Sequence, residues 1–279
     1  MLDRHLSTIA PFGFNFDPAR FLRAYRAAGC RFAQYYRNTA CPPRLADVRL
    51  AAREADIAFD SIHGAFGPEI DPSSPDPSHR DDCLRLYRDE ANLALELGVS
   101  MVVVHPAANF PDNRPRPRGE LEPVQAARWP HFQDFAARLA EVGESTGVTF
   151  LIENVPCTCM LGFDAIELSR RVGKVGSPRL RMCLDSGHAH ITGNLAETVI
   201  AAAPVIEYAH VHDNDGVNDG HLMPGDGTID WVSFADALRR SGLGVPMMLE
   251  VFYSEQQVES LARNGLRERL ARCCPTDGD

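Results

Sequence analysis

Six short hydrophobic segments of this chain each end on a histidine or a carboxylate. They are FDSIH, SMVVVH, TFLIE, LRMCLD, YAHVH and PMMLE, which end on His63, His105, Glu153, Asp185, His212 and Glu250. The strands of a closed parallel barrel all end at one rim, so residues at successive strand ends converge there. Histidine and carboxylate side chains are common ligands of divalent metal ions. The pattern therefore predicts a metal-dependent enzyme with an α/β fold, the (β/α)8 TIM barrel.

Strand-like and helix-like segments alternate along the whole chain, and no linker divides them. The expected strands are His5–Ala10, Arg31–Tyr36, Ile57–His63, Ser100–His105, Val148–Glu153, Leu180–Asp185, Glu207–His212 and Val245–Val251. The expected helices are Asp17–Gly29, Arg44–Asp56, Arg80–Gly98, Trp129–Gly147, Phe163–Val172, a short one from Ala196, Trp231–Ser241 and Glu255–Leu270. Eight such pairs in 279 residues predict one barrel domain over residues 1–279.

Composition and charge narrow the class of protein. The net charge of −10 argues against nucleic-acid binding, which needs clustered basic residues. No apolar run approaches the roughly 18 residues of a membrane span, and the start, MLDRHLSTIAPFG, lacks the apolar core of a secretion signal. The eight cysteines are scattered, which favours free thiols over a disulfide framework. We expect a cytoplasmic enzyme with no membrane or nucleic-acid partner.

Two long segments follow strands on the predicted catalytic rim. Residues 64–79 are rich in Pro, Ser and Asp, and residues 106–130 carry Arg114, Arg116 and Arg118. Long loops at this rim serve as lids or substrate-binding loops, although they can also be solvated decoration. The three arginines could hold a phosphate or a carboxylate. The polar tail, residues 271–279, is expected to be disordered.

At the level of motifs, the chain resembles the xylose-isomerase-like TIM-barrel superfamily. The resemblance covers nearly the whole chain and rests on IHGAF, VVVHP, LIEN, CLDSGHAHITG, HVHDNDGVNDGHLMPGDGTIDW and MLEVF. That superfamily contains sugar and sugar-phosphate isomerases and epimerases, and also the endonuclease IV type of DNA-repair nuclease. A small-molecule carbohydrate substrate and a possible homo-oligomer are implied.

The resemblance also implies roles for individual residues. Four positions match the metal ligands of the isomerase and epimerase branch: Glu153, Asp185, His212 and Glu250. His210 is the competing ligand on the same strand, but only His212 stands in an H-x-N-D sequence. A mixed set of carboxylates and imidazole suits one divalent ion, Mn, Mg, Co or Zn.

The expected activity is isomerisation or epimerisation of a small sugar, sugar phosphate or hydroxy-ketone. Glu153 and Glu250 would be the acid and base that move a proton on carbon, and His188 would contact the substrate oxygen. The remaining rim histidines, together with His188, would bind the substrate: His63, His105 and His221.

Alternatives remain open at this point. His63, His105 and His221 also match the extra ligands of a three-zinc endonuclease IV site, although Gly220 replaces the arginine of the nuclease motif. The ketose 3-epimerases carry a glutamate after strand five and an arginine after strand seven, and neither is present here. A metal-dependent dehydratase of a keto acid or inosose is therefore a further possibility, as is a binding protein with a vestigial site.

Overall fold

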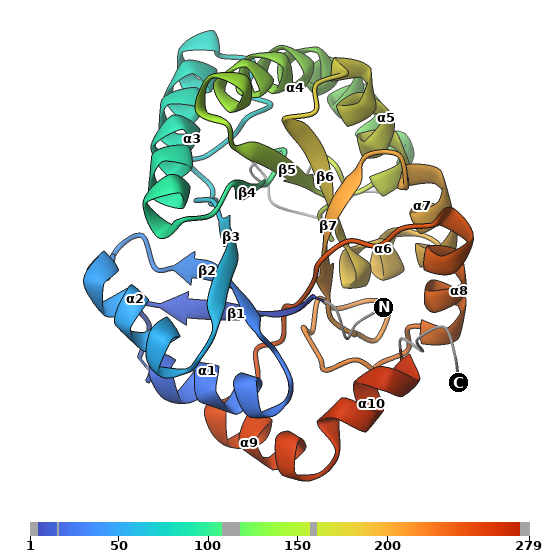
Figure 1. The fold of residues 1–279 in the computed structure, drawn as a ribbon. Coiled ribbons are helices and arrows are strands. Elements are labelled where there is room, and N and C mark those ends of the chain that lie inside the picture. The colour runs from blue at the N-terminus through green and yellow to red at the C-terminus, as the bar shows by residue number, and fades with distance from the viewer. Residues whose placement is uncertain (1–4, 16, 108–117, 157–160, 274–279) are drawn as a thin grey trace.

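Eight parallel strands close into a barrel in this computed structural model, which describes residues 5–15, 17–107, 118–156 and 161–273 (Figure 1). Each strand pairs with the next, and the last pairs with the first, which confirms the predicted (β/α)8 fold. The strands are β1 (Leu6–Phe12), β2 (Phe32–Arg37), β3 (Ala58–His63), β4 (Met101–Val104), β5 (Thr149–Glu153), β6 (Leu180–Asp185), β7 (Ile206–Val211) and β8 (Met247–Leu249).

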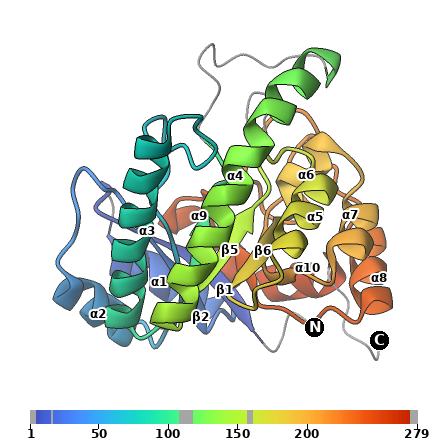
Figure 2. The same ribbon diagram turned by 90° about the horizontal axis from the view of Figure 1, so that it is seen from above.

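Helices surround the barrel and cover the outer face of its strands (Figure 2). They are α1 (Pro18–Ala27), α2 (Leu45–Glu54), α3 (Pro77–Leu97), α4 (Arg118–Thr146), α5 (Ala165–Val175), α6 (Ser186–Thr192), α7 (Leu195–Ala202), α8 (Trp231–Ser241), α9 (Glu255–Arg263) and α10 (Leu266–Cys273). None of the described helices is both long enough and apolar enough to cross a membrane.

The outer helices are held by narrow apolar stripes. In α5 the buried residues include Leu168 and Val172, four positions apart, and in α8 they include Phe234 and Leu238 at the same spacing. This spacing places side chains on one helix face, which packs against the barrel. Each such buried side chain contributes about 1.5–3 kcal/mol relative to an exposed one. Packing against the strands thus fixes the rim to which the loops attach.

Two helices begin earlier than expected and shorten the predicted loops. α3 starts at Pro77 rather than Arg80, because Asp76 accepts a 2.9 Å hydrogen bond from the Ser78 amide and proline suits a first helical position. α4 starts at residue 118 rather than near Trp129, despite two prolines within it, so residues 118–130 of the second predicted loop are helical. Figure 2 shows the start of α4 extending past the neighbouring helices.

Other differences lie at the C-terminal end and after β6. The helix expected over Glu255–Leu270 is two helices, α9 and α10, because Gly265 adopts a φ of +88° between them. α10 continues to Cys273, so the first part of the tail predicted to be disordered is helical. α6 was not expected at all. Of the loop arginines, Arg114 and Arg116 lie outside the described residues, as does the side chain of Arg118.

Candidate metal centre

Three carboxylates and one imidazole meet at the C-terminal rim of the barrel. Glu153 ends β5, Asp185 ends β6, and Glu250 directly follows β8, while His210 lies within β7. One ligand atom from each of these side chains lies within 4.8 Å of the others. His210 Nδ1 is 3.0 Å from both Glu153 Oε1 and Glu250 Oε2, and 3.9 Å from Asp185 Oδ2. We call these four residues the central group.

Burial makes this arrangement electrostatically demanding. All four side chains are buried, and their carboxylates repel one another in a medium that screens charge poorly. Burial alone would raise the pKa of Glu153, but the charge of His210, with the nearby imidazoles of His105 and His63, holds it well below its usual range. Three carboxylates facing one imidazole keep an excess of negative charge even when that imidazole is protonated. The central group therefore favours a bound cation.

Unpartnered oxygens point to the same conclusion. Glu153 Oε2, Asp185 Oδ2 and Glu250 Oε2 are buried and make no hydrogen bond to any described residue. Imidazole nitrogens lie within 4 Å of them, but without hydrogen-bond geometry. Buried polar atoms in native proteins nearly always have a partner. Three carboxylate oxygens gathered without one fit a divalent metal ion, so the residues present match the group that the predicted chemistry requires.

Two further sets of possible ligands flank the central group. The first, the His63 group, consists of His63, His105 and the shared Glu153, whose Oε2 is 3.5 Å from His63 Nε2 and 3.3 Å from His105 Nε2. The second, the Asp219 group, contains four side chains within 4.8 Å: His188, His212, Asp219 and His221. Asp185 connects it to the central group, because Asp185 Oδ1 is 3.0 Å from His212 Nε2.

Most of these imidazoles are anchored on the backbone. Nδ1 of His63 lies 2.9 Å from the Gly64 carbonyl, Nδ1 of His188 lies 2.7 Å from the Asn154 carbonyl, and Nδ1 of His221 lies 2.9 Å from the Glu250 carbonyl. A carbonyl only accepts, so in each neutral ring Nδ1 carries the proton and the Nε2 lone pair faces the site. Metal-binding histidines are commonly oriented by a second hydrogen bond of this kind.

The structure brings His210, rather than His212, to the three carboxylates. The pairing of β6 with β7 sets Asp185 opposite His210, and a register shift at Met182 and Cys183 inserts one extra residue of β7. His212 follows the end of β7, and its Nε2 lies between Asp185 and Asp219 instead. The H-x-N-D sequence that favoured His212 does not reveal this shift.

Asp219 is the site residue that the sequence reasoning did not select. Its Oδ2 lies 3.3 Å from His188 Nε2 and 3.1 Å from His221 Nε2. Burial would lower the pKa of His188, but the charges of Asp185 and Asp219 raise it to about 10 in the metal-free protein. In the same way the pKa of His221 rises to about 9, against the effect of burial, through its hydrogen bond to Asp219. His221 also has a φ of +43°, which is uncommon for a residue with a side chain.

The segments next to the candidate ligands position them through buried hydrogen bonds and close packing. Asp213, fully buried, accepts hydrogen bonds from the amides of Gly225 and Ile229 and from the indole of Trp231. These contacts explain the G-x-G-x-I-D-W sequence, since its turn and tryptophan close over one carboxylate. At Gly187 a Cβ would lie 2.0 Å from His212 Cε1, so a larger residue there would displace the imidazole.

A cavity of about 450 Å³ opens above the carboxylates. Its walls include the aromatic rings of Tyr36, Phe66 and Phe252, and its floor includes Glu153 and Glu250. All of the predicted substrate-binding histidines line it: His63, His105, His188 and His221. No arginine or lysine is among the described residues that line this cavity. It is therefore suited to an uncharged polar molecule with apolar faces.

Sequence comparisons give relatives of two kinds. The xylose isomerase-like TIM barrel model matches residues 22–273. An uncharacterized protein of Methanocaldococcus jannaschii, MJ1311, is 28% identical over 185 residues, covering 65% of this chain and 60% of that protein. A probable endonuclease 4 of Oleidesulfovibrio alaskensis is 29% identical over 228 residues, covering 74% of this chain and 72% of that protein. The chain spans 57% to 60% of the lengths of the two M. jannaschii relatives it matches.

Structure comparison gives epimerase-like barrels. The crystal structure of a D-tagatose 3-epimerase-like protein has a TM-score of 0.75 to this chain and is 20% identical to it, covering 96% of this chain and 98% of that one. At this level of identity the likeness shows a common fold.

Proposed function

Because the chain belongs to the xylose isomerase-like TIM barrel family, we propose that it is a divalent-metal-dependent isomerase or epimerase of a small sugar or related hydroxy-ketone. The observation that carries the proposal is the central group, three buried carboxylates and an imidazole whose inward oxygens lack partners. The cavity above it has aromatic walls and no described arginine or lysine, which supports an uncharged carbohydrate over a sugar phosphate.

Four residues would hold the ion: Glu153, Asp185, His210 and Glu250. Manganese, magnesium, cobalt and zinc all suit this mixture of oxygen and nitrogen ligands. His210 thus replaces His212 in the proposed ligand set, since it is the imidazole that contacts the carboxylates. When bound, a divalent ion supplies Lewis acidity, which weakens the C–H bond beside a substrate carbonyl.

The proton on carbon would be moved by the two glutamates. Glu153 and Glu250 both line the cavity and reach the His210 ring from different strands. One would remove the proton, and the other would return it. Return to the opposite face of the same carbon gives an epimer, and return to the neighbouring carbon gives an isomer. His188, whose Nε2 lies beside Asp219 at the cavity, would donate a hydrogen bond to the substrate oxygen on which charge develops.

Metal content and isotope exchange test this proposal. We expect about one divalent ion per chain in gently purified protein, and deuterium from D2O should enter at least one ketose or aldose in a panel followed by NMR. Glu153→Gln and Glu250→Gln should each slow that exchange by about 10²–10⁴-fold, the usual contribution of a general acid or base. Glu207→Gln, on a half-exposed glutamate in β7, is the matched control. Full exchange in both site variants would refute the assignment.

A second candidate is phosphodiester hydrolysis at a three-metal site. It is favoured by the two flanking groups, which adjoin the central group through Glu153 and Asp185, and by the similarity to a probable endonuclease 4. The net charge of −10 weighs against it. About three zinc ions per chain, together with cleavage of DNA that contains an abasic site, would establish this candidate in place of the first.

A further inference from the structure

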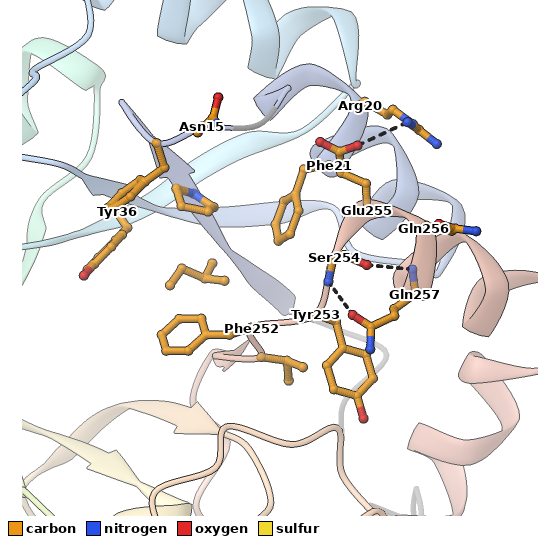
Figure 3. A pocket seen from close by; sticks show the side chains of 14 residues that line it. Asn15, Arg20, Phe21, Tyr36, Phe252, Tyr253, Ser254, Glu255, Gln256 and Gln257 are labelled. Atoms are coloured by element: carbon orange, nitrogen blue, oxygen red, sulfur yellow. Dashed lines mark hydrogen bonds and ion pairs between the residues drawn. The ribbon is translucent and has the colours of Figure 1, made fainter.

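A second cavity lies beside the candidate metal centre, between the segments that follow β1 and β8 (Figure 3). Its volume is about 880 Å³, compared with about 450 Å³ for the cavity above the carboxylates. Tyr36 and Phe252 line both cavities, so the two spaces adjoin at these rings. Pockets of about 300–1,000 Å³ hold drug-sized ligands, so the second cavity alone has room for a ring.

Aromatic side chains form much of its wall. Phe14 stacks on Tyr36, with centroids 5.6 Å apart and planes 10° apart, yet it is 40% exposed. Phe252 stacks on His221 with centroids 4.2 Å apart and is 59% exposed. Figure 3 shows Phe21 and Phe252 turned toward the same space. Exposed aromatic faces around a hollow are typical of ligand contact, because covering them removes apolar surface from water.

The one positive charge among the described residues that line this cavity is paired with carboxylates. Among the described lining residues Arg20 is the only cation, and it lies 3.3 Å from Glu255 and 3.0 Å from Glu259. Figure 3 shows the Arg20 and Glu255 pair at the edge of the space. The other polar lining residues, which include Asn15 and Ser254, are uncharged. A phosphate or carboxylate would find no unpaired cation here, whereas an uncharged ring with apolar faces matches the walls.

We propose that the substrate is a glycoside. Its reacting ring is the reducing one, whose open form carries the carbonyl beside the C–H that loses its proton, and this ring contacts Glu153 and Glu250. A second uncharged ring, joined through a glycosidic oxygen, occupies the cavity lined by Phe14, Phe21 and Phe252. The inference rests on the proposed function and adds the class of substrate. Sugar rings and aryl groups share the required chemistry, since both present flat apolar faces to an aromatic side chain. The two adjoining cavities then hold the two halves of one molecule.

Ligand binding tests the proposal independently of turnover. Dissociation constants are measured by NMR titration of the metal-loaded protein with matched pairs that share the reducing ring: D-glucose with cellobiose or lactose, and D-fructose with lactulose. We expect the second ring to tighten binding by about tenfold or more in at least one pair. Phe14→Ala should reduce that ratio to within twofold of unity and leave monosaccharide binding unchanged. Val232→Ala, at a residue 67% exposed on α8, is the control.

The outcomes separate the subsite from the chemistry. Equal binding of monosaccharide and glycoside in every pair overturns the proposal, as does a ratio that Phe14→Ala leaves intact. Phe14→Leu, with its melting temperature measured, replaces Phe14→Ala if the latter does not fold. Deuterium exchange is recorded on the same ligands. If the second ring tightens binding but no ligand exchanges deuterium, the proposed second-ring site stands and the isomerase function is rejected. If monosaccharides exchange deuterium but the second ring does not tighten binding, the isomerase function stands and the second-ring site is rejected.

Discussion

Asp213 is expected to be the residue whose charge most stabilises the rim loop after β7. Its Oδ1 accepts from the amides of Asn214 and Ile229 at 2.9 and 3.1 Å, and its Oδ2 accepts from the Gly225 amide and the Trp231 indole, both at 2.9 Å. Asp213→Asn keeps the first oxygen but replaces the second with an amide that cannot accept. Two donors then lose their partner, and each buried donor left unsatisfied costs about 1–3 kcal/mol.

The variant should therefore lose about 2–6 kcal/mol of unfolding free energy, measured by urea denaturation of metal-free protein. Trp231→Phe removes one of the two orphaned donors, so Asp213→Asn combined with Trp231→Phe should cost less than the sum of the single changes, by about 0.5–3 kcal/mol. Asp236→Asn, on the half-exposed face of α8, should change stability by less than about 0.5 kcal/mol. A loss below 1 kcal/mol for Asp213→Asn, or strict additivity with Trp231→Phe, would refute the reasoning.

Three further predictions concern the metal and the thiols. His210→Gln should weaken binding of the central ion at least tenfold in a competition titration with a chelator, whereas His212→Gln should leave the central ion in place. If His212→Gln weakens binding and His210→Gln does not, His212 is the ligand, as inferred from the sequence motif. The pKa of His221 is raised to about 9 beside Asp219, so its imidazole is protonated below that pH in the metal-free protein and must lose the proton to bind zinc. Zinc affinity at the Asp219 group should therefore rise between pH 7 and 9, and calorimetry in buffers of different ionisation enthalpy should detect proton release. A zinc affinity that does not change with pH would contradict this prediction. The exposed thiol of Cys41 should react with a maleimide at least tenfold faster than the buried described thiols, which are those of Cys30, Cys83, Cys183 and Cys273. Equal rates would show that the fold opens readily.

The sequence predicted the barrel because its strongest signals are local. Runs such as TFLIE and LRMCLD are apolar enough to be buried on both faces, and each is followed by a helical segment, which leaves few folds other than a parallel barrel. Helix ends were less predictable. α4 continues through Pro123 and Pro130, which local rules treat as breaks, because its later turns pack on the barrel.

Within the site, residue types were easier to predict than partners. Glu153, Asp185 and Glu250 come together as expected from their positions at strand ends. Whether His210 or His212 faces the carboxylates depends on a register shift between β6 and β7, and such a shift leaves no trace in an alternating hydrophobic pattern. Asp219 lies in a loop whose path is set by long-range hydrogen bonds, so no periodicity identified it.

Anchoring the imidazoles on backbone carbonyls has a consequence for how the site is filled. Three rings, those of His63, His188 and His221, are held through Nδ1 by backbone carbonyls at the rim, which fixes their direction. The rotational entropy of these side chains is therefore lost when the chain folds, before any ion arrives. A substrate that enters the cavity therefore meets side chains that already stand in place. Empty and loaded barrels should consequently superimpose at these three rings, with the difference between them residing in solvent and protons.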